Sequence, residues 1–402
     1  MQAKKIINRL AELPTMPSTI GTMEWNQTGD WRYLTPVAAD KTAPCRRNCP
    51  AGIPIPVYLE AVNRGDVQTA LALLLAYNPL PGLTGRLCYH PCQTDCTRKK
   101  VDGPIPIREI ERFLSELSLE EKNNPFEMRD KQVTIIGSGP LGLSCAFFLG
   151  CLGLRVTVLE ANSRAGGVLL DLSKQKIEAA ILENEIKRLI RIAHIRLVTD
   201  AVVDLKGYGN LPKSDLTLLD PTGGLEASVP AGEGGIFDPF ADEEIPGYLI
   251  AVTLPENLKN FKASLIAHYI AAGRQTAEKV FGHLVGSPEQ GKGEPGPEIF
   301  LKGEALESPQ NADPSTARSP VGKGTEAEGA ERRKGILFEA SRCLYCGTCD
   351  LCQQCISSCP EACVRMNTHK SGVSVDLDFC KGCGLCAYEC PRGVITMEEA
   401  ES

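Results

Sequence analysis

Cysteine is the residue type in this chain best suited to do chemistry, because its thiols are grouped at spacings that favour metal binding. Two runs near the C-terminal end, residues 349–360 and 380–391, each follow the pattern C-x2-C-x2-C-x3-C-P. Thiolates at this spacing can enclose a [4Fe-4S] cluster, and in paired runs the fourth cysteine of each run binds the cluster of the other. The pattern predicts two clusters, with the ligand sets Cys349, Cys352, Cys355, Cys390 and Cys380, Cys383, Cys386, Cys359.

Two questions stay open for this region. Zinc also binds paired C-x2-C motifs, although a zinc site does not need two such runs in tandem. Three further cysteines, Cys343, Cys346 and Cys363, fall outside both ligand sets. Because the cysteines from Cys343 to Cys355 recur every third residue, only the Cys-Pro end fixes the frame. The additional thiols could join a third cluster that finds another ligand, or they could be redox-inert.

Composition and charge narrow the class of protein. The chain has 402 residues, 18 cysteines and a formal net charge of -7. This length suits two or three domains, and clustered cysteines argue against a disulfide framework. The first residues lack the apolar core of a signal peptide, and the longest apolar run, residues 141–154, is too short to span a bilayer. We expect a cytoplasmic protein of an anaerobic setting, with no membrane span and no basic surface for nucleic acid.

A second group of cysteines lies near the N-terminal end, among apolar helical patterns. Its members are Cys45, Cys49, Cys88, Cys92 and Cys96. The surrounding segments Ala-Pro-Cys-Arg-Arg-Asn-Cys-Pro-Ala-Gly and Gly-Arg-Leu-Cys-Tyr-His-Pro-Cys resemble the N-terminal iron-sulfur domain of the small subunit of bacterial glutamate synthase. Dihydropyrimidine dehydrogenase shares that domain. The resemblance implies an α-helical domain that holds [4Fe-4S] clusters.

This chain departs from that family in its number of ligands. The C-x2-C pair normally found just ahead of Cys45 is absent, and five cysteines cannot fill two cubanes. The resemblance therefore implies one cluster, whose matching ligands are Cys49, Cys88 and Cys92. Its fourth ligand stays open between Glu111, at the position of a glutamine ligand in some members, and Cys45 or Cys96. The alternative is a helical scaffold with relict thiols.

Residues 133–160 carry a nucleotide-binding pattern. An apolar strand leads into the turn Gly137-Ser-Gly139-Pro-Leu-Gly142, a buried helix and a second strand that ends in Glu160. The glycines allow a tight turn and bring backbone N–H groups to a pyrophosphate at the helix N-terminus, and the acidic residue accepts ribose hydroxyls. The flanking strands and the acidic residue make this a dinucleotide-binding prediction.

The same resemblance names the cofactor as FAD and extends the site to a second flavin-contacting turn. The cofactor-binding residues that result are Gly137, Gly139, Pro140, Gly142, Glu160, Arg164, Gly166 and Gly167. Cys145 and Cys151 on the intervening helix fit core packing better than metal binding.

The match to the family breaks off beyond residue 200. Residues 205–247 contain no strand, glycine-rich turn and helix in series, so the NADPH domain of the family looks deleted. The Gly-Asp pair that approaches the flavin in the family is missing from residues 249–255, and the match resumes in the helix that starts at Ile266. FAD is expected on balance, against the alternative of an empty scaffold kept for its shape.

We predict a multidomain α/β plus α+β protein with five segments. They are an N-terminal docking segment (1–44), a helical iron-sulfur domain (45–128), a truncated FAD-binding Rossmann-like domain (129–285), a flexible linker (286–335) and a bacterial-type two-cluster ferredoxin domain (336–402). The linker is rich in Gly, Pro, Glu and Ser. Trp25 and Trp31 could anchor a partner or fasten the first segment to its own domain. That stretch weakly resembles δ subunits of 2-oxoacid:ferredoxin oxidoreductases.

No acid-base or nucleophilic constellation is visible, because the five histidines are scattered and His90 lies between cluster ligands. The chemistry expected is electron transfer. We predict an electron-transfer subunit of an anaerobic oxidoreductase complex, with other subunits and ferredoxin as partners and a 2-oxoacid oxidoreductase as the leading partner candidate. The alternatives are a stand-alone NAD(P)H- or ferredoxin-dependent flavoprotein oxidoreductase and a non-redox assembly scaffold.

Overall fold

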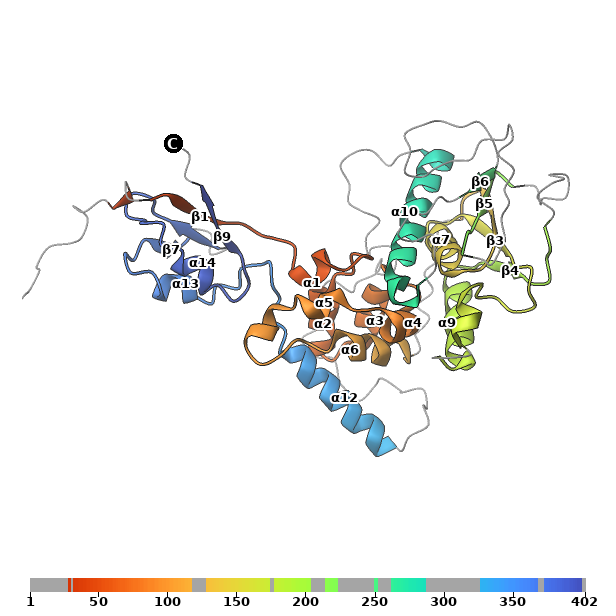
Figure 1. Cartoon of the computed structure of the whole chain (residues 1–402), viewed down its shortest axis with the longest axis horizontal. Coiled ribbons are helices and arrows are strands. Elements are labelled where there is room, and N and C mark those ends of the chain that lie inside the picture. Colours follow the sequence, from red (N-terminus) through yellow and green to blue (C-terminus); the bar gives the residue numbers. More distant parts are fainter. Residues whose placement is uncertain are drawn as a thin grey trace, which may run out of the picture. The chain divides into compact units, whose positions relative to one another are not determined.

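The computed structural model describes residues 28–29, 32–117, 128–173, 177–203, 214–222, 249–251, 262–286, 326–367 and 372–399 (Figure 1). The chain divides into two compact units. Met1–Lys41 and Cys346–Ser402 form the smaller unit, and Thr42–Tyr345 form the larger one. In the described part of the chain, no helix is both long enough and apolar enough to cross a membrane.

The first part of the larger unit is helical, as the resemblance implied. Its helices are α1 (Pro44–Arg47), α2 (Ile55–Asn63), α3 (Val67–Leu75), α4 (Pro81–Leu87), α5 (Pro91–Thr94), η4 (Thr97–Lys100) and α6 (Ile107–Ser115). Several begin with proline, whose missing N–H costs nothing in the first turn. Asp66 caps α3 by accepting a hydrogen bond from the Thr69 N–H at 3.0 Å.

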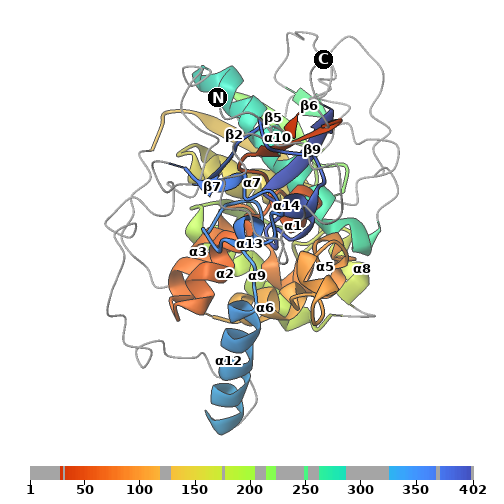
Figure 2. The ribbon, with the colours of Figure 1, turned by 90° about the vertical axis from the view of Figure 1, so that its left-hand side faces the viewer.

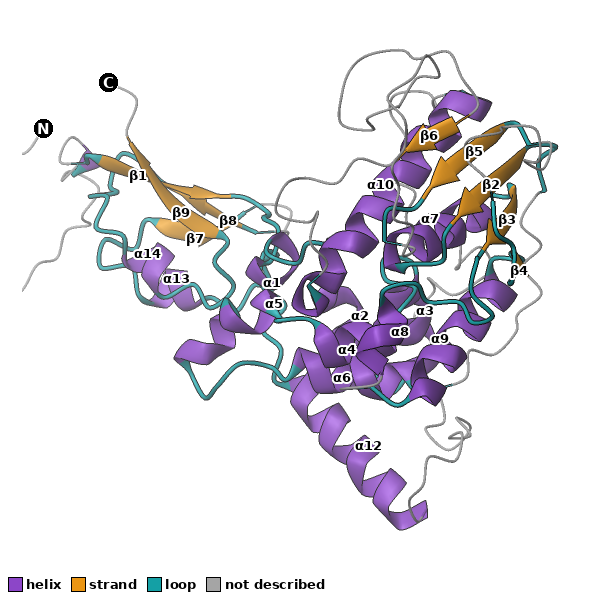
Figure 3. Ribbon diagram, turned by 45° about the vertical axis from the view of Figure 1, so that its right-hand side comes forward, coloured by secondary structure: helices purple, strands orange, loops and turns teal. Residues whose placement is uncertain are grey.

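A parallel sheet with helices forms the second part of the larger unit (Figure 3). Its strands are β2 (Gln132–Ile136), β3 (Arg155–Leu159), β4 (Arg196–Val198), β5 (Leu216–Leu219) and β6 (Leu249–Ala251), in the order β4-β3-β2-β5-β6. Its helices are α7 (Pro140–Cys151), α8 (Leu169–Ser173), α9 (Ala179–Ile192), η6 (Ala263–Leu265) and α10 (Ile266–Val285). The sequence did not predict β5, which pairs with β2 in register Thr134↔Thr217.

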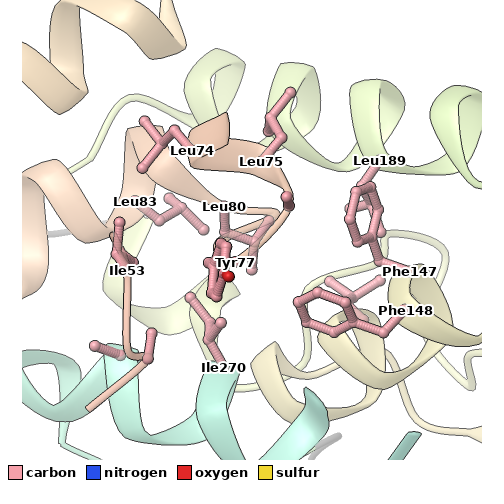
Figure 4. Close-up of a cluster of buried hydrophobic side chains, with 14 of the residues drawn as sticks. Ile53, Leu74, Leu75, Tyr77, Leu80, Leu83, Phe147, Phe148, Leu189 and Ile270 are labelled. Carbon is pink, nitrogen blue, oxygen red and sulfur yellow. The ribbon is translucent and has the colours of Figure 1, made fainter. Parts of the chain in front are cut away.

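One hydrophobic core joins the helical part to the sheet part. Figure 4 shows Leu74 of α3, Phe147 of α7, Leu189 of α9 and Ile270 of α10 in one buried cluster. Every residue of α7 is buried, so this helix is the centre of the packing. Cys145 and Cys151 belong to the same core, which confirms that they are packing residues.

Helix α12 (Glu326–Ser341) corrects the predicted linker and the start of the ferredoxin domain. The sequence predicted a flexible linker from 286 to 335, but the helix runs through residue 335. It belongs to the larger unit and packs against α2 and α6. Arg342, just after it, forms an ion pair with Asp102 at 3.0 Å. Partners supplied by α2 and α6, rather than any strong apolar stripe of its own, therefore hold this segment as a helix. Residues 287–325 lie outside the described residues.

The smaller unit has the ferredoxin-type arrangement of short strands and helices. It contains β7 (Val364–Met366) and β8 (Val373–Val375) as one hairpin, the helices α13 (Gln354–Ser357) and α14 (Leu385–Tyr388), and β9 (Ile395–Glu399) paired with β1 (Leu34–Ala38). Helices α13 and α14 pack against each other (Figure 2).

The described part of the N-terminal segment is built into this smaller unit. Strand β1 pairs antiparallel with β9 in register Pro36↔Met397. The Gly29 N–H donates a hydrogen bond to the Asp378 carbonyl at 2.8 Å, and Arg32 donates to the Leu377 carbonyl at 2.6 Å. The segment predicted for docking thus packs on the ferredoxin unit itself. Trp25 and Trp31 lie outside the described residues.

Candidate iron-sulfur sites and the Rossmann turn

The first predicted ligand set converges around Cys355, which lies buried on α13. Burial, together with the nearby charges of Cys390, Cys352 and Cys349, raises the pKa of the Cys355 thiol to about 11. A thiolate in such surroundings needs a positive centre beside it, and iron supplies one. The structure therefore brings together the three cysteines of the first run and the last cysteine of the second.

The second predicted set lines one cavity of the smaller unit. The thiol-bearing residues of its lining are Cys359, Cys380, Cys383, Cys386 and Cys363. Burial and the charges of Cys380, Cys383 and Cys359 raise the pKa of Cys386. The first four of these residues are the set that the crossed ligation pattern predicts. Cys363 is an additional thiol, with its Sγ 3.4 Å from the Cys359 Sγ.

Zinc is the alternative that the sequence left open for these thiols. Among the described residues, no group of three or more Cys, His, Asp or Glu side chains is arranged to hold a single metal ion. A zinc thiolate site is a compact tetrahedron with Zn–S distances of about 2.3 Å. Thiolates around a cubane stand further apart, because four irons and four sulfides lie between them.

The two cysteine runs have nearly the same backbone path. Leu351 and Gln353 of the first run have φ of 62° and 64°, and their counterparts Gly382 and Gly384 have φ of 67° and 80°. Left-handed backbone is natural for glycine but costs other residues energy. Both runs therefore make the same left-handed turns, although only the second run has glycines that adopt them freely.

Two ion pairs at matching positions tie the runs together. Arg392 of the second run binds Asp350 of the first at 2.8 Å, and Lys381 of the second run binds Glu361 of the first. Salt bridges of this partly exposed kind contribute little each. Their matching positions nevertheless agree with a pseudo-symmetric pair of sites.

In the larger unit, the half-buried Cys49 lies near three buried residues, Cys88, Cys92 and Glu111. Burial raises the pKa of Cys49 and Cys88 to about 11 and that of Cys92 further, and the charge of Glu111 adds to each shift. The charge of Cys45 in α1 also raises the pKa of Cys92. The structure thus gathers the three ligands that the resemblance implied, with Glu111 and Cys45 beside them. Cys96 immediately precedes η4, and its charge contributes to the raised pKa of Arg98.

Glu111 is buried, as a cluster ligand would be, whereas most glutamates lie on the surface. Its side chain is 3% exposed on α6, and its carboxylate accepts a hydrogen bond from the Tyr58 hydroxyl at 3.4 Å. Burial raises the pKa of Glu111 to about 8, although Tyr58 and Thr84 offset part of the shift. The carboxyl group is thus buried beside the thiols, and the charge of Arg108 acts on one of them, lowering the pKa of Cys88 in part.

His90 has a structural role, as its position between two cluster cysteines suggested. It adopts φ of 53° before α5, and its Nδ1 donates a hydrogen bond to the Cys88 carbonyl at 2.7 Å. Burial lowers the pKa of His90 to about 4, so the ring is neutral. Its backbone N–H lies 3.3 Å from the Cys88 Sγ, where it can tune a sulfur ligand.

The Rossmann turn folds as the glycine pattern predicts. Gly137 has φ of 103°, which needs a residue without a side chain. Glu160 directly follows β3 and is 1% exposed. One carboxylate oxygen accepts hydrogen bonds from Ser138, and the other accepts from Asn162 at 3.0 and 2.8 Å.

The second predicted flavin-contacting turn also makes an ion pair and a hydrogen bond within the domain. Arg164 forms an exposed ion pair with Glu183 at 2.5 Å. The Gly166 N–H donates a hydrogen bond to the Ser138 Oγ at 2.9 Å. Gly166 and Gly167 have φ of 137° and 50°, so both use the freedom of glycine.

Two residues that the sequence did not single out, Asp220 and Thr222, meet the glycine turn. They follow β5 and are 1% and 3% exposed. The signal for them was the short apolar run Leu-Thr-Leu-Leu closed by Asp-Pro-Thr-Gly, which has the form of a buried strand and its turn. The Leu141 N–H points to the Thr222 Oγ1 at 3.4 Å, and a Cβ at Gly139 would overlap Thr222. Oxygens of the chain itself thus lie where the motif would place a pyrophosphate, so the residues present fit FAD poorly.

Three stretches of the chain match known families. Residues 38–123 match dihydropyrimidine dehydrogenase domain II with a 4Fe-4S cluster, residues 135–180 match an NAD(P)-binding Rossmann-like domain, and residues 348–394 match a 4Fe-4S dicluster domain. The chain is thus built from a helical iron-sulfur domain, a Rossmann-like domain and a C-terminal dicluster domain. This confirms the predicted fold class.

Several oxidoreductase subunits are similar to part of the chain. The beta subunit of NADP(+)-dependent formate dehydrogenase from Moorella thermoacetica is 33% identical over 37% of this chain and 25% of its own. The beta subunit of NADPH-Fe(3+) oxidoreductase from Geobacter sulfurreducens is 39% identical over 32% of this chain and 20% of its own. The small chain of NADPH glutamate synthase from Bacillus subtilis is 38% identical over 35% of this chain and 30% of its own. The expected resemblance to glutamate synthase is confirmed, although the chain spans under a third of each relative.

Proposed function

We propose that this chain is an electron-transfer subunit of a larger oxidoreductase and that it relays single electrons through [4Fe-4S] clusters. The observation that carries the proposal is the grouping of thiols in the smaller unit. Cys355 meets Cys349, Cys352 and Cys390, and a cavity gathers Cys359 with the other three cysteines of the second run. A [4Fe-4S] cluster bound there would accept and release one electron at a time.

The chain's own residues would set the properties of those centres. The Gly382 N–H lies 3.4 Å from the Cys380 Sγ, so it can donate a hydrogen bond to that sulfur. Hydrogen bonds to sulfur, together with burial, tune the reduction potential of a cluster. The cysteines therefore hold the metal, and the backbone around them adjusts it.

For the larger unit we propose one further cluster on Cys49, Cys88 and Cys92. Glu111 is the fourth ligand that we favour, because it is buried and its charge acts on all three thiols. Cys45 is the alternative fourth ligand, since its charge also raises the pKa of Cys92. Iron content of Glu111→Ala and Cys45→Ser separates the two, because only loss of the true ligand lowers iron by about four atoms.

Electrons would enter or leave through other subunits. The relatives are subunits of NADPH-dependent enzymes by name, whereas this chain shows no catalytic constellation among its described residues. We propose that a partner carries the substrate chemistry, with a 2-oxoacid oxidoreductase as the leading candidate and ferredoxin as a further electron partner. FAD is not included in the relay, because the Rossmann turn fits it poorly.

Iron and sulfide analysis of anaerobically purified protein tests the proposal. We expect about twelve irons per chain and a rhombic electron paramagnetic resonance signal after reduction with dithionite. Metal content dominated by zinc, or no reducible centre, would refute it and would favour the scaffold hypothesis.

A stand-alone NAD(P)H oxidoreductase is the second hypothesis, supported by the Rossmann-like family match at residues 135–180. It predicts that the isolated chain reduces a dye with NADH or NADPH. The electron-transfer proposal predicts no such activity, together with rapid dye reduction by the dithionite-reduced chain.

A further inference from the structure

The N–H groups at the N-terminus of α7 lie beside oxygens of the chain itself. These are the groups that hold the pyrophosphate in a dinucleotide-binding fold. Pro140 has no N–H, and the Leu143 N–H donates to the Gly139 carbonyl at 2.9 Å. The Leu141 N–H points to the Thr222 Oγ1 at 3.4 Å.

Asp220 lies beside the two remaining N–H groups of the turn, those of Gly139 and Gly142. The N–H groups of Gly139 and Gly142 lie close enough to lower its pKa somewhat, although neither makes a well-directed hydrogen bond to Oδ2. The Oδ1 accepts hydrogen bonds from the Thr222 N–H at 2.9 Å and from the Thr222 hydroxyl at 2.6 Å. The carboxylate is therefore fixed with its second oxygen toward the glycine turn.

The space beside the glycines is filled as well. In a dinucleotide-binding turn, the second glycine leaves room for the backbone to approach the pyrophosphate. Here a Cβ at Gly139 would overlap the Oγ1 and the carbonyl of Thr222, and a Cβ at Gly142 would lie 2.6 Å from the Asp220 Oδ2. Thr222 therefore occupies the room beside Gly139, and Asp220 packs against Gly142, the glycine that lets the helix lie close to the neighbouring strand.

Thr222 also closes the path between the two predicted flavin-contacting turns. Its carbonyl accepts a hydrogen bond from the Val168 N–H at 3.2 Å, just after Gly167. Its hydroxyl faces the first turn, as described above. One residue thus links both turns across the place where the cofactor would lie.

Strand pairing holds this arrangement in place. Strand β5 is parallel to β2, and the Asp220 N–H donates to the Ile136 carbonyl at 2.9 Å. Carboxyl ends of neighbouring parallel strands meet at one edge of a sheet, which is the edge where ligands bind in such folds. A dinucleotide would have to displace buried groups and bring its phosphates beside the Asp220 carboxylate.

We infer that the Rossmann domain of this chain binds no dinucleotide, because Asp220 and Thr222 occupy the pyrophosphate end of the site. The domain serves instead as the framework of the helical iron-sulfur part. The Glu185 carboxylate of α9 accepts a hydrogen bond from the Gly82 N–H of α4 at 2.7 Å, and Arg188 donates to the Ser115 carbonyl at 2.8 Å.

Direct binding measurements on the intact chain test the first part of the inference. Purified protein is incubated anaerobically with excess FAD, desalted and acid-treated, and the released flavin is quantified by chromatography. NADH and NADPH are titrated by calorimetry. We expect under about 0.1 FAD per chain and dissociation constants weaker than about 1 mM. Close to one FAD per chain, or micromolar binding of either nicotinamide, would overturn the inference.

A variant tests whether Asp220 is the occupant. Removal of its side chain in Asp220→Ala opens an anion-sized space beside Gly142. Inorganic phosphate should then raise the melting temperature of the variant by roughly 2–4 °C at about ten times its dissociation constant, relative to chloride of equal ionic strength. The wild type should not respond.

Asp215→Ala is the matched control, because Asp215 precedes the same strand but is partly exposed beside Lys131. It should not respond to phosphate. A response of wild type and both variants alike, or of none of them, would show that Asp220 is not the occupant.

The outcome is independent of the proposed electron-transfer function. A chain with about twelve irons and one FAD would keep the relay and overturn this inference. A chain with neither iron nor flavin would refute the relay and leave the inference intact.

Discussion

The ferredoxin unit and the Rossmann domain each carry a motif of full length, yet the fold uses the two motifs differently. In the ferredoxin unit, Cys390 joins the cysteines of the first run and Cys359 joins those of the second, so thiols face one another around shared space. In the Rossmann domain, the glycine turn faces Asp220 and Thr222 from the neighbouring strand. A motif fixes local backbone geometry, but the residues that pack on it decide whether its donors face a ligand.

Loss of a ligand from the ferredoxin unit should have the largest effect. Cys383→Ser removes one of four thiolates in the second set, so we expect the chain to lose one cluster, about four irons. Metal analysis and the reduced-state resonance spectrum measure this loss. Cys363→Ser is the matched control, because Cys363 lines the same cavity outside the predicted set. Equal iron loss in the control would show that the ligand frame is wrong.

Removal of Glu185 tests whether the Rossmann domain is a support. Glu185 and Arg188 form a buried ion pair, and Glu185 also accepts the Gly82 N–H. Glu185→Leu leaves the Arg188 charge unpaired in the core, which should lower the free energy of unfolding by about 3–5 kcal/mol. Urea denaturation followed by circular dichroism measures the change.

The exposed ion pair of Glu183, also on α9, provides the control for Glu185→Leu. Glu183→Leu breaks only the surface pair with Arg164 and should cost less than about 1 kcal/mol. Similar losses in the two variants would contradict a supporting role for the α9 contact with α4.

The pH dependence of stability reports on Asp220. Burial raises its pKa in the folded protein above the unfolded value of about 3.9. The folded state then binds the proton more tightly, so this contribution to stability is present below the unfolded pKa and is lost as pH rises through the folded pKa. Asp220→Asn has no such titration, and its free energy of unfolding minus that of the wild type should rise as pH increases.

Thermal melts of both proteins across the acid-to-neutral range measure this difference. A difference that falls with pH would mean that the glycine turn stabilises the Asp220 anion, and the pKa would then lie below its usual value.

The smallest expected effect concerns the backbone of the two cysteine runs. Gln353 is exposed with φ of 64°, while its counterpart Gly384 has φ of 80°. Gln353→Gly should stabilise the ferredoxin unit by about 1 kcal/mol, because glycine removes the left-handed strain. The reverse variant Gly384→Gln should lose a similar amount, since a Cβ there would lie 3.8 Å from the nearest atom and would have room. Melting of the iron-loaded protein checks both, and a destabilised Gln353→Gly would show that the glutamine side chain contributes more than its backbone costs.

Much of the fold followed from local pattern. The helical segments around Cys49 and Cys88, the strand-turn-helix at residues 133–151 and the cysteine runs all formed where the sequence predicted. Prediction failed at α12, where a segment rich in small and charged residues is helical because it packs on α2 and α6. It also missed β5, a short strand with no periodicity of its own, whose placement depends on pairing with β2.

The sequence by itself determined which chemical groups the chain can present to a cofactor. The spacing of Cys349 to Cys390 and of Gly137 to Gly142 sets which atoms a short loop can expose. Only the tertiary structure decided what meets those atoms. Asp220 lies far from the glycine turn along the chain, and β-strand pairing alone brings it there. The physical reason is that a thiol site is completed by cysteines that the motif itself supplies, whereas a dinucleotide site needs empty space, and space is a property of packing.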